Sequence, residues 1–118
     1  MKLGDVVAKP DRGCLNCANI LARQEMYSRI IQAVSEFYGI TREQIMSCDR
    51  SLPVVTARQV AMYIARTHKR EPLSAIAYVF GKTFATVLHH VQAIKRRIET
   101  EPDLRNAVKE IIFSIQRL

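Results

Sequence analysis

Apolar residues recur at three- and four-residue spacing along most of the chain, which is the pattern of amphipathic helices. The first such stretch spans about residues 15–38 and ends at Gly39. Its apolar stripe consists of Tyr27, Ile30, Ile31, Val34, Phe37 and Tyr38. Thr41 and Gln44 then form a capping-box pattern, which predicts the start of a very short helix. No segment alternates with the period of two expected of a half-buried strand, so the sequence predicts an all-α fold.

A second capping-box pattern, Thr56 with Gln59, predicts a helix that reaches about His68, preceded by a loop over residues 47–53. The stripe expected in the core is Ala57, Val60, Ala61 and Ile64. The side chains that fall within a narrow arc on the opposite face are Arg58, Met62, Arg66 and Lys69. We therefore expect this face to be exposed and partly basic.

The segment after Pro72 predicts a pair of helices, over residues 73–80 and 83–100, joined by a turn that contains Gly81. Two helices joined by a tight turn with glycine form a helix-turn-helix, whose second helix enters the major groove of DNA. A last helix begins at Pro102. Its apolar stripe is Leu104, Ala107, Val108, Ile111, Ile112 and Ile115. We expect this stripe to lie in the core; the alternative is a dimer or partner surface.

The second helix of the pair has an apolar face and a polar face. The expected core side chains are Val87, Leu88, Val91, Ile94 and Ile98. The side chains expected to point outward are Ala85, Thr86, His89, Gln92 and Arg96. Because the N-terminal residues of such a helix contact base edges, Thr86 and His89 are the expected base readers. A threonine methyl or Ala85 also suits a thymine methyl.

Other residues of the pair have simpler expected roles. Lys82 and Arg96 suit phosphate groups, which fix position on the duplex but carry no sequence information. Thr83 is either an N-cap or a base contact. Phe84 and His90 are expected to pack against the rest of the domain.

Composition and charge agree with a nucleic-acid partner. The 118 residues fit one domain, are 48% hydrophobic and 25% charged, and carry a formal net charge of +7. Glu71 is the single acidic residue in the most basic stretch. The basic residues there are Arg50, Arg58, Arg66, Lys69, Arg70, Lys82, Lys95, Arg96 and Arg97. A basic excess in the segment that carries the motif is expected of a phosphate-contacting surface, although a solvated basic face is also common.

Three blocks of sequence, in order, carry a family resemblance. The first is RQVAMYIAR at residues 58–66. The second is L-S-x-I at residues 73–76 followed by F-G at residues 80–81, and the third is TVLH at residues 86–89. Together they resemble the C-terminal DNA-binding domain of the bacterial replication initiator DnaA, over about residues 30–98. The resemblance implies a helix-turn-helix bundle of about six helices, similar to the Trp repressor.

The resemblance also implies roles for particular residues. Arg50 corresponds to a loop arginine that enters the minor groove, and Arg58 and Gln59 correspond to residues that contact the DNA backbone. Arg66 corresponds to a lysine that the family has later in the same helix. Thr86 and His89 correspond to the threonine and histidine at the major groove.

The chain departs from the family pattern in two places. The family usually reads G-G-R-D-H-T-T-V-L-H, whereas this chain is one residue shorter and has Thr83-Phe84-Ala85 in place of the Asp-His-Thr trio. Cys48, Asp49 and Leu52 replace arginines of the family's loop. These departures predict DNA binding with an altered base preference.

The nucleotide-binding domain of DnaA has no counterpart here. Gly81-Lys82-Thr83 is not a phosphate loop, because Ile76 stands where that motif needs glycine. We therefore expect a sequence-specific binder of double-stranded DNA that uses no nucleotide or other cofactor and regulates replication initiation or transcription. The alternative is a protein-interaction or dimerisation module that keeps the fold, with a second copy or another replication or transcription protein as its partner.

The remaining motifs support no catalytic or metal site. Cys14 and Cys17 have zinc-type spacing, but a structural zinc site needs four ligands and no second paired motif is present. Neighbouring His89 and His90 point about 100° apart on a helix, so we expect neither a chelating pair nor an enzyme. The aperiodic residues 1–14 are expected to form a flexible arm before a domain over residues 15–118. Without an apolar leader or membrane segment, the expected location is the cytoplasm.

Overall fold

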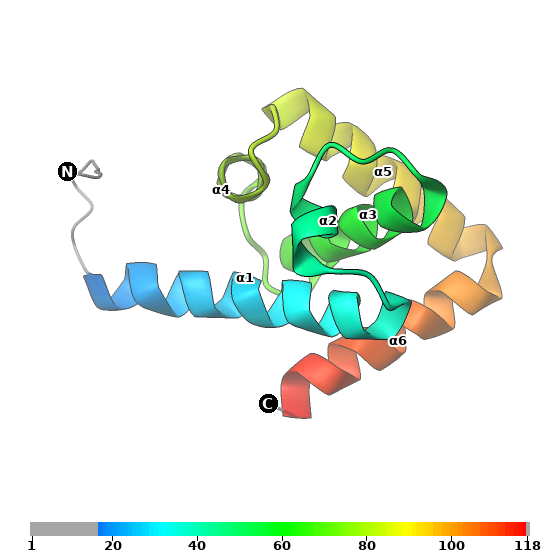
Figure 1. The fold of residues 1–118 in the computed structure, drawn as a ribbon, viewed down its shortest axis with the longest axis horizontal. Coiled ribbons are helices and arrows are strands. Elements are labelled where there is room, and N and C mark those ends of the chain that lie inside the picture. Colours follow the sequence, from blue (N-terminus) through cyan, green and yellow to red (C-terminus); the bar gives the residue numbers. More distant parts are fainter. Residues whose placement is uncertain (1–16, 118) are drawn as a thin grey trace.

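The computed structural model describes residues 17–117, with side chains from 23 to 116. Within this part the chain forms helices and no strand, as the hydrophobic pattern predicts (Figure 1). The helices are α1 (Cys17–Tyr38), α2 (Arg42–Met46), α3 (Leu52–Thr67), α4 (Leu73–Phe80), α5 (Phe84–Thr100) and α6 (Pro102–Arg117). The all-α bundle of six helices is therefore confirmed. The expected arm over residues 1–14 and the side chains of Cys14 and Cys17 lie outside the described residues.

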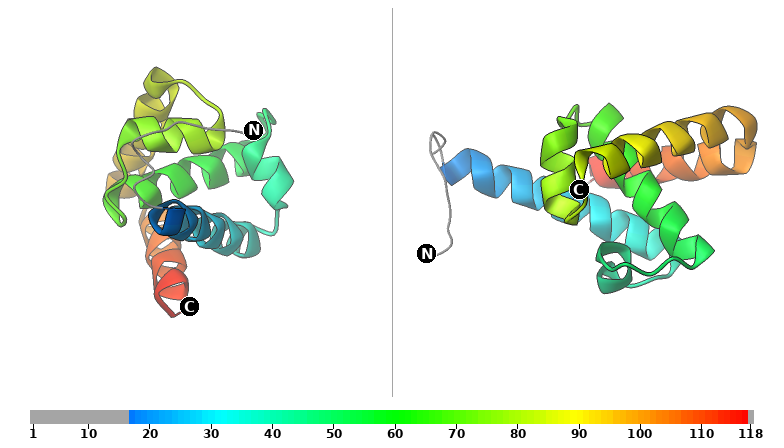
Figure 2. Two further views of the ribbon diagram at one scale, coloured as in Figure 1. Left: turned by 90° about the vertical axis from the view of Figure 1, so that its left-hand side faces the viewer. Right: turned by 90° about the horizontal axis from the view of Figure 1, so that it is seen from above.

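Helix α3 is the central element of the bundle. It packs against α1 on one side and against α4 and α5 on the other (Figure 2, left). The expected core stripe is fully buried, but Met62 on the opposite face is fully buried as well. The expectation of one exposed face is therefore wrong at Arg58 and Met62, which are buried, whereas Arg66 is exposed as expected. Helix α2 covers part of that face, because it also packs against α3.

The start of α3 differs from the expectation. The helix begins at Leu52, after Ser51, and Thr56 lies buried within it, so the second capping box is wrong. Pro53 falls in the first turn, where a missing backbone N–H removes no helical hydrogen bond. The first capping box is confirmed: the Thr41 hydroxyl accepts from the Gln44 backbone N–H, and the Gln44 side chain accepts from the Thr41 backbone N–H.

The expected helix pair is present as α4 and α5. Gly81 ends α4 with φ of +65°, a left-handed conformation that favours glycine. The Lys82 backbone N–H donates to the Ala77 carbonyl at 2.9 Å, which closes the turn. Thr83 then caps α5: its hydroxyl accepts from the Thr86 backbone N–H. The helix-turn-helix is confirmed, and Thr83 has the structural role of an N-cap.

Helix α6 closes the bundle against α1 and α5 and turns back sharply from the end of α5, so that the two helices form an open V in Figure 1. Most of the expected stripe lies inside: Leu104, Val108, Ile111 and Ile115 are buried in the core, and Ala107 and Ile112 are half-buried. The expectation that this stripe is core is confirmed. No helix among the described residues is long and apolar enough to cross a membrane.

A buried carboxylate joins α1 to the segment before α4. Glu71 accepts a hydrogen bond from the Tyr27 hydroxyl at 2.9 Å and pairs with Arg23 at 3.2 Å. Burial and the neighbouring carboxylate both raise the pKa of Tyr27, so the phenol stays protonated as a donor. The Arg66 guanidinium donates to the backbone carbonyl of Glu71 at 3.1 Å. These contacts fix the direction in which α4 leaves α3.

Candidate nucleic-acid interface

The outer face of α5 carries the polar side chains that the sequence predicts. Val87, Val91 and Ile94 are buried against the bundle. The exposed residues on the opposite face are Ala85, His89, Gln92 and Arg96. The core face therefore holds α5 in place, and the outer face is open to a partner.

The threonines at the start of α5 bond to each other. The Thr83 hydroxyl accepts from the Thr86 backbone N–H at 3.1 Å and donates to the Thr86 hydroxyl at 2.9 Å. Thr86 itself is half-buried rather than fully outward. The first turn is thus rigidly capped, and both hydroxyls are partly occupied before any ligand arrives.

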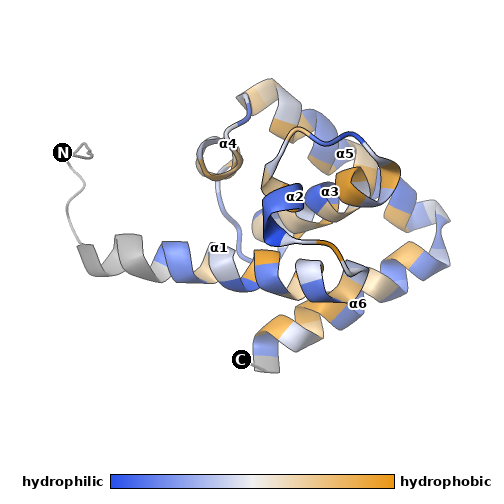
Figure 3. Ribbon diagram, in the orientation of Figure 1, coloured by the Kyte–Doolittle hydropathy of each residue, from blue (hydrophilic) through white to orange (hydrophobic). Residues whose placement is uncertain are grey.

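Two apolar side chains lie differently from the expectation. Phe84 was expected to pack inward but is 53% exposed, and Leu88 was expected in the core but is 36% exposed. Phe84 is the first residue of α5, so no preceding helical turn covers its ring. Figure 3 shows this hydrophobic beginning of α5 at the outer edge of the bundle.

Arg58 has a structural position that the sequence does not predict. Its side chain is only 4% exposed, and burial lowers its pKa. The guanidinium donates to the carbonyl oxygens of Ile45 at 2.8 Å, Asp49 at 3.1 Å and Gln44 at 3.2 Å. The expectation that Arg58 lies on an exposed basic face is wrong, because the α2–α3 loop folds over it.

The α2–α3 loop lies beside the turn of the helix-turn-helix. Within the loop, the Asp49 carboxylate accepts from the Ser51 backbone N–H at 2.8 Å, a bond that lowers the pKa of Asp49. Lys82, in the turn, reaches the loop with its Nζ 3.9 Å from the Cys48 Sγ. Arg50 is exposed, and its side chain forms no hydrogen bond or ion pair with the described residues. The loop therefore presents an exposed guanidinium two residues from Cys48, the residue that Lys82 contacts.

Two side-chain pairs join α3 to α5. The Gln59 Nε2 lies 2.9 Å from the His90 Nδ1, and Arg97 donates to the Thr56 hydroxyl at 3.2 Å. Arg97 also pairs with Glu101 at 3.0 Å. His90 thus packs as expected, while Gln59, which the resemblance assigns to the DNA backbone, is buried and bonded to the histidine. These contacts fix the orientation of α5.

A comparison with known families identifies this arrangement. The model of the bacterial DnaA protein helix-turn-helix matches residues 27–94, which run from the middle of α1 into the last turns of α5. The chain belongs to this family. Its α4–α5 pair is accordingly the helix-turn-helix of a DnaA-type DNA-binding domain.

The similar proteins are chromosomal replication initiators named DnaA. The protein of Chloroflexus aggregans is 39% identical over 90 residues, covering 75% of this chain and 19% of the relative. That of Desulfatibacillum aliphaticivorans is 35% identical over 79 residues, covering 67% and 17%. That of Thermotoga petrophila is 28% identical over 100 residues, covering 84% and 23%. The chain thus spans about a fifth of the length of these relatives.

A solved structure has the same fold. The AMPPCP-bound DnaA of Aquifex aeolicus superposes with a TM-score of 0.67 at 21% identity, covering 82% of this chain and 30% of that one. The likeness therefore extends beyond the stretch that the DnaA family model matches. It shows the arrangement of the helices.

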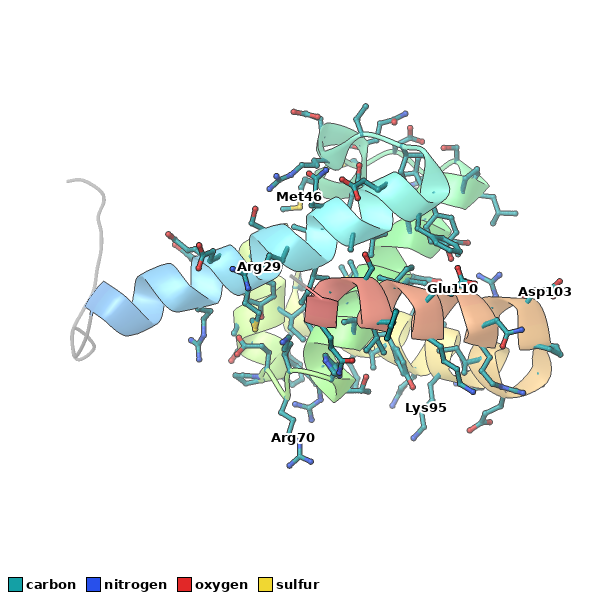
Figure 4. The ribbon with its side chains drawn as sticks, turned by 90° about the horizontal axis from the view of Figure 1, so that it is seen from below. Arg29, Met46, Arg70, Lys95, Asp103 and Glu110 are labelled. Atoms are coloured by element: carbon teal, nitrogen blue, oxygen red, sulfur yellow. The ribbon has the colours of Figure 1, made fainter. Side chains whose placement is uncertain are left out.

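The free cations of this DnaA-type domain lie at several places around α5. Arg96 is exposed on its outer face, and Arg66 is exposed at the end of α3 although it is bonded to the Glu71 carbonyl. Lys95 and Arg70 point away from the bundle on one side (Figure 4). No group of three metal-binding side chains occurs among the described residues. Exposed cations thus lie on α3, on α5, in the α2–α3 loop and in the segment before α4.

Proposed function

We propose that this DnaA-type domain binds double-stranded DNA sequence-specifically, with the first turns of α5 in the major groove. The observation that carries the proposal is the open face of α5 beside two basic elements, the turn with Lys82 and the loop with Arg50. A helix-turn-helix docks in this way, with N-terminal residues of its second helix at the base edges.

The residues divide into two roles. Thr83, Ala85, Thr86 and His89 stand at the start of α5, where base edges are read; Thr83 does so in addition to its capping role. Arg50 would enter the adjacent minor groove. Lys82, Arg96 and Arg66 would contact phosphates, each contact steepening the fall of affinity with salt. Arg58 and Gln59 support the loop and α5 from inside the domain, without touching DNA.

The proposed output is regulation of replication initiation or transcription from the cytoplasmic nucleoid, without nucleotide hydrolysis by this chain. The family match and the DnaA relatives support the link to replication. The alternative, a dimerisation module, requires the apolar stripe of α6 to be available to a partner. The buried residues of that stripe already pack in the core of the domain. We therefore do not propose it.

The experiment is a salt-titrated binding measurement with three duplexes: a DnaA-type box, the best sequence from a randomised pool, and a scrambled control. We expect the pool sequence to bind at least tenfold more tightly than the scrambled duplex, with affinity falling steeply as salt increases. Equal, weak binding to all three at low salt would contradict the proposal.

A further inference from the structure

The tip of α5 is apolar where a base-reading helix usually presents hydrogen-bonding groups. Phe84 is 53% exposed, Leu88 is 36% exposed, and Ala85 beside them is also exposed. Phe84 and Leu88 are four residues apart, so they share one side of the helix. Because side chains of a helix lean toward its N-terminus, the Phe84 ring covers the end that enters the groove.

The polar groups of this turn do not offset its apolar character. No residue from Thr83 to Thr86 carries an amide, a carboxylate or a cation, and the hydroxyls of the two threonines bond to each other. Beyond these two hydroxyls, the next side chain able to bond with a base edge is His89, one turn further along α5. The first contact that the tip makes in a groove is therefore apolar.

The major groove offers one apolar group among the four bases. Guanine, cytosine and adenine edges present acceptors and donors, whereas thymine also presents its C5-methyl group. Placing Phe84 against a polar edge would remove water from that edge without replacing its hydrogen bonds, which is unfavourable. A thymine methyl loses no hydrogen bond in the same place.

We propose that Phe84, flanked by Ala85 and Leu88, is a base-selecting residue that reads the 5-methyl group of thymine in the major groove. The proposal rests on the proposed function and adds its target class: duplexes that place one or two thymines beneath the tip of α5. Basic residues near the tip favour DNA as the occupant, because Lys82 lies two residues before Phe84 and the α2–α3 loop that Lys82 contacts carries the exposed Arg50.

The test removes single methyl groups from the DNA. In the best duplex from the randomised pool, each thymine is replaced in turn by uracil, which pairs identically but lacks the methyl. Burial of one methyl group corresponds to about a fourfold change in affinity. We expect the dissociation constant of the wild-type domain to rise about fourfold at one or two positions and to stay unchanged elsewhere.

Variants assign the effect to a residue. Phe84→Ala should bind the thymine and uracil duplexes equally, and because the ring is largely exposed the variant should keep its helical circular-dichroism spectrum. Phe37→Ala is the matched control: it removes another half-exposed phenylalanine, on α1, and should keep the fourfold ratio. Lys82→Ala should weaken both duplexes and keep the ratio.

The outcomes separate the two proposals. Selective binding to the pool sequence with no uracil effect at any thymine would overturn the role of Phe84, as would an unchanged ratio in Phe84→Ala. In either case the apolar tip would serve another occupant, such as a protein. Failure of the wild-type domain to prefer any duplex over the scrambled control would instead overturn DNA recognition itself.

Discussion

The amide Nε2 of Gln59 lies 2.9 Å from the imidazole Nδ1 of His90, which joins the central helix α3 to α5. This bond requires an unprotonated Nδ1, since the amide nitrogen is a donor. Burial lowers the pKa of His90, and the charges of His89, Arg58 and Lys82 lower it further. The pair therefore favours neutral histidine in the folded domain.

Acid should weaken the domain through this histidine. The unfolded chain has an ordinary His90 pKa near 6.5, above the folded value, so it binds a proton first as pH falls. The contribution of neutral His90 is fully present above about pH 6.5 and is lost below it. Urea denaturation at pH 8 and pH 5 should show a smaller decrease in unfolding free energy for His90→Gln than for wild type. The exposed neighbour provides the control, His89→Gln; equal decreases in all three proteins would contradict the prediction.

Arg58 should affect stability rather than the salt dependence of DNA binding. Arg58→Ala leaves three carbonyl oxygens without their charged donor and should lower the unfolding free energy by about 2–3 kcal/mol. Arg96→Ala, on the exposed face of α5, should change it by less than about 0.5 kcal/mol. Arg58→Gln removes the charge but keeps an amide donor for the carbonyl oxygens, so it is the variant for binding, and its salt slope should equal that of wild type. A slope reduced by about one in a folded Arg58→Gln protein would return Arg58 to the phosphate surface.

Substitution of Lys82 should lower the affinity for all duplexes, whereas substitution of His89 should lower the preference for one duplex over another. Lys82→Ala should weaken binding to every duplex alike and reduce the salt slope by about one, because a phosphate contact carries no sequence information. His89→Ala should reduce the ratio between the best and the scrambled duplex and leave the slope nearly unchanged. Binding isotherms at four salt concentrations measure both quantities. Equal losses on all duplexes from both variants would contradict this division.

Gly81 should matter through its backbone conformation alone. A Cβ atom at this position meets no heavy atom within 4 Å, so Gly81→Ala introduces no collision. The positive φ should still destabilise the alanine variant by about 1 kcal/mol, and Gly81→Asn should lose less, since asparagine tolerates this region. Thermal denaturation of both variants measures the difference. A larger loss for asparagine than for alanine would show that side-chain volume, rather than φ, is limiting.

The regular features of this fold can be predicted from sequence because they are local. The α4–α5 pair follows from Pro72, Gly81 and the three- and four-residue spacing of apolar positions, and the stripe of α6 predicts its buried face. These signals lie within one helix or one turn. The all-α architecture and the outward positions of Ala85 and His89 depend on nothing more distant.

The failures concern residues whose surroundings come from elsewhere in the chain. A helical projection assigns Arg58 and Met62 to an open face because it assumes one core side, whereas α2 and its loop cover the other side. Thr56 resembles a helix cap in the sequence, but its hydroxyl accepts a hydrogen bond from Arg97, 41 residues away. Phe84 was assigned to the core from its helical angle, although the first residue of a helix lacks a preceding turn to shelter it.

The exposed residues of α5 and the contacts that hold it in the bundle lie at different places along its length. At its beginning Thr83, Phe84, Ala85 and Leu88 are exposed, while α6 packs against its body and Arg97 ties its last turns to α3. Substitutions at the exposed tip therefore disturb few of the contacts that hold the bundle together. If α5 binds DNA as proposed, changing the exposed residues of this one turn alters the target while the bundle stays folded.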